Sequence, residues 1–508
     1  MMNKVKTGKI ALAIIMVTLA SKLLGFLRES IIASNFGASH ETDAYVIAVT
    51  IYSIVSVVFW ESINNAFVPQ YISISKKDSN KANIFASNIM LHMLIITLSI
   101  VIIGELSIKL VINLIAPGFS DEVALLAQKL TRITLPVILV TGVSIIIGGI
   151  LQANEKFLPQ DLMGIPNHIM VIVMLLVFGN KLGITGLTIL TTIGTAILII
   201  VQLPFLRSAG FNFTPEISRT TAEYKLFYIS IIPIFISTSA RQINVLVDRA
   251  LASVAGYGNI SVLNYANTLN LAVIGLFIST VSTILYPYMA SALQDKRKSA
   301  EIINESISKM IIIVLPITIA ICMLKYELVS VAYERGSFSY QNALSVSNAF
   351  MYYSISLIPY GVTDILNKYL YILGHNRAAM SAGIASIFIN VVFNFILIKP
   401  MGISGLALST SISSFITMIM LIIFIKRNYE FKLKSLLREC IPLIIGGIIM
   451  ATGMFVIKLN LDADIATGYK LLNNLIIAAV SIAVGTVLYV SVIYLHKKRV
   501  KYKAHTFL

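Results

Sequence analysis

Charged side chains that lie inside long apolar segments are the residues of this sequence that could pair with one another or bind a charged ligand. In segment 10–35, Lys22, Arg28 and Glu29 recur at helical spacing with Ser21 and Gly25. That spacing places all five on one side of an α-helix. A charge at the centre of a bilayer costs at least about 2.5–3.5 kcal/mol, so this side should meet protein or water rather than lipid.

A second polar side is predicted in segment 224–254, where Ser237, Arg241, Asn244 and Asp248 recur at helical spacing and Arg249 adjoins them. One interpretation is that the ions of these segments pair with one another inside the protein. Arg28 would then pair with Glu29 or Glu61, and Arg241 with Asp248.

The other interpretation is an anion-binding cavity. Arginine binds a phosphate through two parallel hydrogen bonds and stays charged in apolar surroundings, and lysine adds a point charge. Segment 43–72 adds an acidic residue near one end and a second one deeper. On this interpretation the substrate-binding residues are Lys22, Arg28, Asp43, Glu61, Arg241 and Arg249.

Polar residues in later segments raise the alternative of a cation site. Asn390 and Asn394 share one side of a predicted helix, Thr410 follows in the next, and Asp248 is the nearest plausible charge. Oxygen ligands of this kind suit Na⁺, although buried asparagine also ties membrane helices together. The sequence therefore leaves open a sodium site at Asp248, Asn390, Asn394 and Thr410.

The elements that must position these residues are membrane spans. Hydrophobic residues make up 57% of the 508 residues and charged residues 12%, against roughly 25% charged in soluble domains. That composition excludes a soluble enzyme. Spans of about 20 apolar residues are predicted at 10–35, 43–72, 84–115, 123–153, 161–179, 184–206, 224–254, 259–293, 303–332, 342–372, 377–398, 403–425, 438–457 and 471–495.

Most of the basic residues behind the net charge of +16 lie in loops and tails on one side of the predicted membrane. The loops and tails on one side carry 24 basic residues, whereas the other side carries six, at Lys181, Lys325, Arg335, Lys399, Lys458 and Lys470. Because positive loops stay in the cytoplasm, both termini are predicted to be cytoplasmic, with the first helix uncleaved. No nucleic-acid partner is needed to explain the charge.

The chain also repeats itself at an offset of about 220 residues. The run Gly183-Ile-Thr-Gly186-Leu recurs as Gly402-Ile-Ser-Gly405-Leu, and Pro69 matches Pro287. A repeat of six helices, an even number, gives two halves of the same orientation, as in transporters. The fold class is therefore an all-α polytopic membrane protein with two six-helix lobes, 1–222 and 223–430, plus two C-terminal helices and a basic tail in 431–508.

Enzyme chemistry is not indicated. The sequence has no ATP-binding loop and no nucleophile motif, and its six histidines show no metal-ligand spacing. Cys322 and Cys440 lie far apart in apolar stretches, which excludes a disulfide framework. We therefore expect a transporter without a cofactor, driven by Na⁺ or the membrane potential.

Several motifs resemble the MurJ (MviN) lipid II flippases, in the right order over about 1–425. The resemblance starts in Ser21–Glu29, Phe36-Gly-Ala, Thr42-Asp-Ala-Tyr45 and Ala66-Phe-Val-Pro69. It continues in Val247–Ala252, Asn264-Tyr-Ala-Asn267, Glu334-Arg-Gly-Ser-Phe338 and Pro400–Ala407. It implies the fold of the multidrug/oligosaccharidyl-lipid/polysaccharide exporter superfamily. It also implies alternating-access export of undecaprenyl-diphosphate-linked precursor for peptidoglycan and cell-wall biogenesis, which maintains cell shape.

The resemblance also bears on single residues. It makes Arg28 a cavity arginine and Asp43 a family acidic position. Lys22 stands where the family has arginine, the helix 2 arginines are absent around Val57–Val58, and Thr268 replaces an arginine. Helices 7, 11 and 12 hold Na⁺ in some members, and Asn394 stands here in place of an acid.

The function expected is a lipid II flippase, acting as a monomer among membrane lipids in the bacterial cytoplasmic membrane. The missing arginines keep a flippase for another lipid-linked polysaccharide, of capsule or teichoic type, as the first alternative. A cation-coupled multidrug antiporter is disfavoured because the predicted cavity is cationic. A scaffold without transport is disfavoured because it has no need of costly intramembrane charges.

Overall fold

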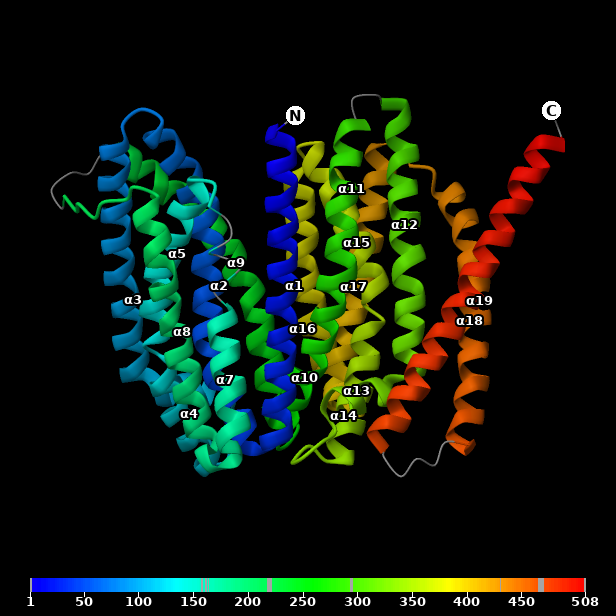
Figure 1. Cartoon of the computed structure of the whole chain (residues 1–508), viewed down its shortest axis with the longest axis horizontal. Coiled ribbons are helices and arrows are strands. Elements are labelled where there is room, and N and C mark those ends of the chain that lie inside the picture. The colour runs from blue at the N-terminus through cyan, green and yellow to red at the C-terminus, as the bar shows by residue number, and fades with distance from the viewer. Residues whose placement is uncertain are drawn as a thin grey trace. The chain divides into compact units, whose positions relative to one another are not determined.

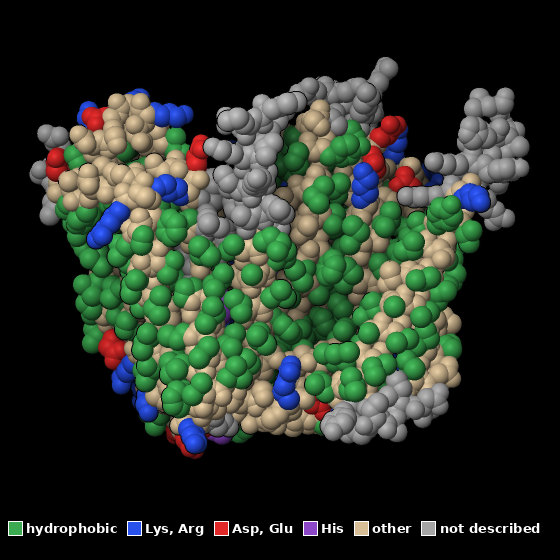
Figure 2. Space-filling view, viewed as in Figure 1, with side chains coloured by type: hydrophobic (Ala, Val, Ile, Leu, Met, Phe, Trp, Pro, Cys, Tyr) green, Lys and Arg blue, Asp and Glu red, His purple; other side chains and the backbone are tan. Residues whose placement is uncertain are grey.

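The computed structural model is all-helical and divides into two compact units, Met1–Ser261 and Val262–Leu508. It describes the backbone of residues 2–156, 164–216, 222–292, 296–429, 431–464 and 470–506, with single positions at 159 and 162. Figure 2 shows hydrophobic side chains over most of the visible helix surfaces, and Lys, Arg, Asp and Glu gathered near helix ends. That distribution is expected where helices face lipid along their length.

The first unit is centred on α2, which packs against α3, α4, α5 and α9, whereas α1 packs on α7. The core beside α2 includes the stacked rings of Phe67, Tyr71 and Phe85. The elements are α1 (Met2–Phe36), α2 (His40–Ser75), α3 (Ser79–Ile115), α4 (Asp121–Thr134), α5 (Val137–Ala153), α7 (Gly164–Phe178), η1 (Gly179–Leu182), α8 (Gly183–Ser208) and α9 (Ala222–Val254).

The second unit contains a helical group around α12, α15 and α17, with α18 and α19 crossing each other beside α12 (Figure 1). Its elements are α10 (Asn259–Val273, whose first turn lies in the first unit), η2 (Ile274–Ile278), α11 (Ser279–Ala292), α12 (Lys296–Met323), α13 (Lys325–Tyr333), α14 (Tyr340–Ser354), α15 (Leu357–Ile372), α16 (Asn376–Met401), α17 (Ile403–Asn428), α18 (Leu433–Asp464) and α19 (Lys470–Thr506). The turn η2 is a π-helical insertion between α10 and α11.

The predicted all-α membrane fold is confirmed. Within the described residues, eleven helices are long and apolar enough to span a membrane. Three predicted spans fall outside this set for local reasons: α1 carries three charges in its described half, α7 has 15 residues, and span 342–372 is divided into α14 and α15. Counted with these three, the helices match all fourteen predicted spans.

Local sequence explains where the helices begin and break. Ser39 caps α2 by accepting a hydrogen bond from the N–H of Thr42, and Asp78 caps α3 in the same way. Such caps satisfy N–H groups that have no partner within the helix. The predicted span 123–153 is interrupted at Pro136, which separates α4 from α5, because proline lacks the N–H that the helix ladder requires.

The internal repeat has matching local geometry in both units. Gly183 opens α8 with φ +60°, and Gly402 opens α17 with φ +57°, a region that glycine enters without steric penalty. Pro69 and Pro287 each lie inside a helix, α2 and α11. The compact units divide after Ser261, so α9 packs within the first unit, whereas the repeat assigns it to a second lobe. The lobe boundaries at 222 and 430 stay a prediction.

Candidate functional site

Arg28 is the half-buried cation of the first unit, and its guanidinium is held in place by two neighbours. It donates through Nη2 to Oε1 of Glu29 at 2.6 Å and through Nη1 to Oδ1 of Asn167 at 3.2 Å. Its Nε is buried and has no hydrogen-bond partner among the described residues. The predicted Arg28–Glu29 pair is confirmed.

Asn167 on α7 positions that guanidinium. Its Nδ2 donates to the carbonyl of Thr191 and to Oγ1 of Thr195, both at 3.0 Å. The hydroxyls of Tyr45 and Thr191 lie 3.0 Å apart and extend the network to α2. Since Asn167 is buried and bonded on both sides, it fixes the direction of Arg28. Sequence reasoning missed Asn167; the signal was a polar Asn-His pair in the apolar segment 164–178.

Glycines allow α1 and α7 to approach closely beside Arg28. A Cβ at Gly25 would lie 3.2 Å from Nε2 of His168, and one at Gly164 would lie 3.1 Å from Oγ of Ser21. The imidazole of His168 occupies the space that larger side chains at these positions would fill. The polar side of α1 therefore faces α7 over this stretch.

Lys22 lies on the same helix, six residues before Arg28, and its side chain is exposed. Among the described residues it has no ion pair, unlike Arg28. Within residues 16–36 of α1, whose side chains are described, the structure thus places one exposed and one held cation, with Glu29 balancing the second.

Arg241 on α9 forms an ion pair with Glu61 on α2. Oε2 of Glu61 also accepts a hydrogen bond from the hydroxyl of Thr238 at 3.3 Å. The side chains of Arg241 and Glu61 are 56% and 38% exposed, so the first unit does not enclose this pair. Two residues of the predicted substrate-binding set therefore pair with each other here.

Asp43 and Arg249 lie together at another end of the unit and are buried. The Asp43 carboxylate accepts hydrogen bonds from N–H of Gly258, and from N–H and Oγ of Ser261, at 2.6–2.7 Å. Arg249 donates through Nη1 to the carbonyl of Ile260 at 3.1 Å. Both side chains hold the turn before α10, where a carboxylate stabilises free N–H groups.

The residues predicted for sodium bond to one another within the second unit. Nδ2 of Asn394 donates to Oδ1 of Asn390 at 2.9 Å, and Nδ2 of Asn390 donates to Oγ1 of Thr410 at 3.2 Å. Oδ1 of Asn390 and Oγ1 of Thr410 each accept one of these hydrogen bonds, and none of the three side chains is charged. The arrangement fits a tie between α16 and α17 better than a Na⁺ site, and Asp248 lies in the first unit. The sodium site stays a prediction.

Comparison with known proteins gives consistent similarity over most of the chain. The profile of the lipid II flippase MurJ family matches residues 32–474. A probable lipid II flippase MurJ from Buchnera aphidicola subsp. Acyrthosiphon pisum is 27% identical over 88% of this chain and 89% of its own length. One from Thermotoga maritima is 25% identical, covering 86% of this chain and 91% of the relative.

Solved structures agree with the sequence comparisons. A lipid II flippase MurJ in an inward closed conformation superposes with a TM-score of 0.79 at 26% identity, covering 95% of this chain and 100% of that one. An inward-facing multidrug transporter of the MATE family gives 0.68 at 15% identity, covering 83% and 99%. The second likeness concerns the fold alone.

Proposed function

Because the chain belongs to the lipid II flippase MurJ family, a family of multi-pass membrane transporters and not of enzymes, we propose that it moves lipid II from the inner to the outer leaflet of the bacterial cytoplasmic membrane. The observation that carries the proposal is the Arg28 site. A membrane-embedded guanidinium held between Glu29 and Asn167, with a buried N–H left over, suits a lipid diphosphate.

The diphosphate binds first to the cations on α1. Lys22 attracts it from the water-exposed side, and Arg28 then donates hydrogen bonds to its oxygens, because charge-assisted bonds to phosphate are among the strongest in proteins. Glu29 keeps the site near neutral while it is empty. Only the phosphates need this protein charge; the polyprenyl tail stays in lipid beside α18 and α19.

Arg241 binds the diphosphate after it has released the carboxylate of Glu61. In this structure its guanidinium pairs with Glu61, so a diphosphate must displace that carboxylate before Arg241 can bind it. The exchange couples arrival of substrate to a change in the contact between α2 and α9, which is the kind of differential contact that alternating access requires. Asp43 and Arg249 would hold the ends of the helices instead of contacting substrate.

Orientation and driving force follow from charge. With 24 basic residues on the predicted inner side against six outside, both termini are cytoplasmic. A negative-inside potential then favours outward movement of the anionic substrate by about 2.3 kcal/mol per charge per 100 mV. We propose that the protein acts as a monomer. The proposed mechanism has no step that requires Na⁺.

The test is Arg28→Ala in cells whose own lipid II flippase has been depleted. The wild-type chain is expected to restore export of lipid II, and Arg28→Ala to lose it by at least tenfold at equal protein abundance. Arg132→Ala is the matched control, since Arg132 pairs with Glu105 on the exposed surface of the same unit. Normal export by Arg28→Ala, or failure of the wild type to complement, would contradict the proposal.

A further inference from the structure

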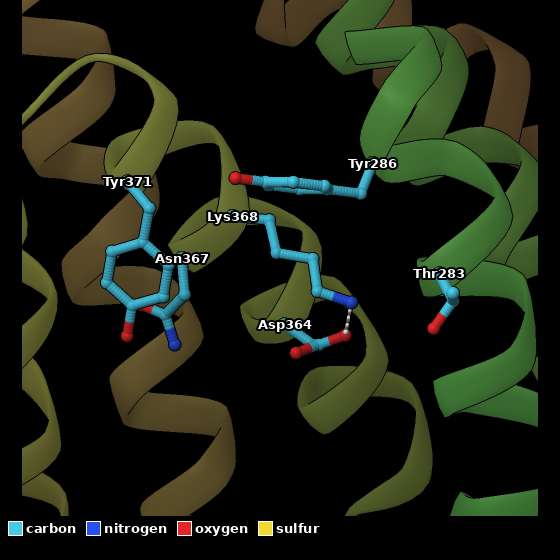
Figure 3. A pocket seen from close by; sticks show the side chains of 6 residues that line it. All are labelled: Thr283, Tyr286, Asp364, Asn367, Lys368 and Tyr371. Atoms are coloured by element: carbon cyan, nitrogen blue, oxygen red, sulfur yellow. Dashed lines mark ion pairs between the residues drawn. The ribbon is translucent and has the colours of Figure 1, made fainter. Parts of the chain in front are cut away.

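A cavity of about 390 Å³ lies between α11 and α15 within the second unit. Figure 3 shows Thr283 and Tyr286 reaching into it from α11, and Asp364, Asn367, Lys368 and Tyr371 from α15. The volume falls in the range of roughly 300–1,000 Å³ that is typical of small-molecule sites. None of these residues belongs to the Arg28 site.

The helices present these side chains as two facing sets. Asp364, Asn367, Lys368 and Tyr371 are spaced at three, four and seven residues, and Thr283 and Tyr286 at three. Such spacings place side chains on one side of a helix. Because α11 packs against α15, six polar or aromatic side chains converge in a segment whose surroundings are apolar.

The charges in the cavity cancel. Nζ of Lys368 lies 3.3 Å from Oδ2 of Asp364 and donates to Oγ of Ser282 at 2.5 Å. A phosphate placed here would meet the Asp364 carboxylate, and a cation would meet the Lys368 ammonium. The ligand that suits the cavity is therefore neutral and rich in hydroxyl or amide groups.

Asn367, which lines the cavity, has unused hydrogen-bonding capacity. Its Oδ1 is buried and has no partner among the described residues, and a buried acceptor is stabilised by gaining a donor. The aromatic rings of Tyr286 and Tyr371, 41% and 51% exposed, supply flat apolar faces next to these polar groups. Aromatic faces beside amide, carboxylate and hydroxyl groups match the alternating C–H and O–H surface of a sugar ring.

We propose that this cavity is a saccharide site, which binds a neutral sugar that carries hydroxyl and amide groups. The inference goes beyond the proposed function and does not rest on it, because the cavity lies within the second unit and no residue of the Arg28 site lines it. Asn367 Oδ1 accepts a sugar O–H or N–H, Tyr286 packs against the ring, and the Asp364–Lys368 pair offers one acceptor and one donor.

The experiment uses the full-length protein purified in detergent and two probes. Binding of a free N-acetylated disaccharide is followed by saturation-transfer NMR, and binding of sugar-free undecaprenyl diphosphate by native mass spectrometry. The cavity variants are Asn367→Leu and Tyr286→Ala; the second removes an exposed ring, so folding is not at risk. Asn460→Leu and Tyr494→Ala, exposed on α18 and α19, are the matched controls.

The disaccharide signal is expected to fall at least fivefold in both cavity variants and to persist in both controls, while affinity for undecaprenyl diphosphate stays within twofold. Unchanged disaccharide binding in the cavity variants, or its displacement by inorganic diphosphate, would overturn the saccharide site. This readout does not depend on transport. If Arg28→Ala exports lipid II normally while Asn367→Leu loses the disaccharide signal, the proposed function fails and a saccharide site remains.

Discussion

The carboxylate of Asp43 on α2 accepts two hydrogen bonds from Ser261 in the first turn of α10, from its N–H at 2.7 Å and from its hydroxyl at 2.6 Å. A third bond comes from the N–H of Gly258. This carboxylate joins residues 218 positions apart in the chain. As a negatively charged acceptor it repels an anionic substrate instead of binding it.

Replacing Asp43 with asparagine should destabilise the first unit. The amide side chain would offer one acceptor oxygen, and its N–H₂ group would face a second donor, so at least one charge-assisted hydrogen bond is lost. We expect a loss of about 1.5–3 kcal/mol, measured as earlier thermal unfolding in detergent. Glu41→Gln, exposed in the same first turn of α2, should unfold like the wild type. Equal unfolding temperatures for both variants would contradict the assigned role of Asp43.

Glu61→Gln tests the exchange of partners at Arg241. The pair is substantially exposed, so its removal should change stability by less than about 1 kcal/mol. Affinity for undecaprenyl diphosphate should instead rise about fivefold, since roughly 1 kcal/mol of competition for the guanidinium is removed. Glu105→Gln, which frees Arg132 in the same way, should not change it. Weaker binding by Glu61→Gln would show that Glu61 supports the site and does not compete with the substrate.

Gly25→Val tests the close approach of α1 and α7. Alanine at this position meets His168 at 3.2 Å and requires a shift of a few tenths of an ångström, whereas the branched valine cannot fit without separating the helices. We expect Gly25→Val to cost about 1–3 kcal/mol and Gly25→Ala distinctly less, by thermal unfolding. Gly383→Val on α16 has open space around the new side chain and serves as control. A Gly25→Val variant as stable as this control would exclude tight packing at Gly25.

Acid should loosen the contact between α13 and α19. Burial raises the pKa of Glu334, but hydrogen bonds from Lys470, Ser330 and Tyr326 outweigh it and hold that pKa below its ordinary value of 4.5. A carboxyl with a lowered pKa stabilises the fold above its unfolded pKa, and that stabilisation is lost as the pH falls through the folded pKa. The protection of amides at the start of α19 against hydrogen exchange, relative to their intrinsic rates, should therefore fall below about pH 4.5. Glu334→Gln should exchange rapidly at neutral pH already, and identical profiles for the two proteins would refute the prediction.

Arg28, Asp43 and Asn167 illustrate how far sequence reasoning reached. The cost of an unpaired charge in a membrane predicted an acidic partner for Arg28 but left Glu29 and Glu61 open. The structure pairs Glu29 with Arg28 and Glu61 with Arg241. The partners of Asp43 were not, since no spacing rule relates residue 43 to residues 258 and 261. Asn167 gave only a weak signal, because a single polar residue in an apolar span is compatible with many roles.

By itself, the sequence determined that the chain is an all-α transporter with cationic membrane helices. Hydrophobic length, helical periodicity and loop charge are local properties of the sequence. They directly determine which segments insert into the bilayer and in which orientation. Only the tertiary structure decided which charged side chains are paired with partners inside the protein and which are not. That choice depends on distances between helices far apart in the chain. Glu61 neutralises Arg241, Asp43 binds N–H groups at the start of a helix, and the buried Nε of Arg28 has no partner among the described residues.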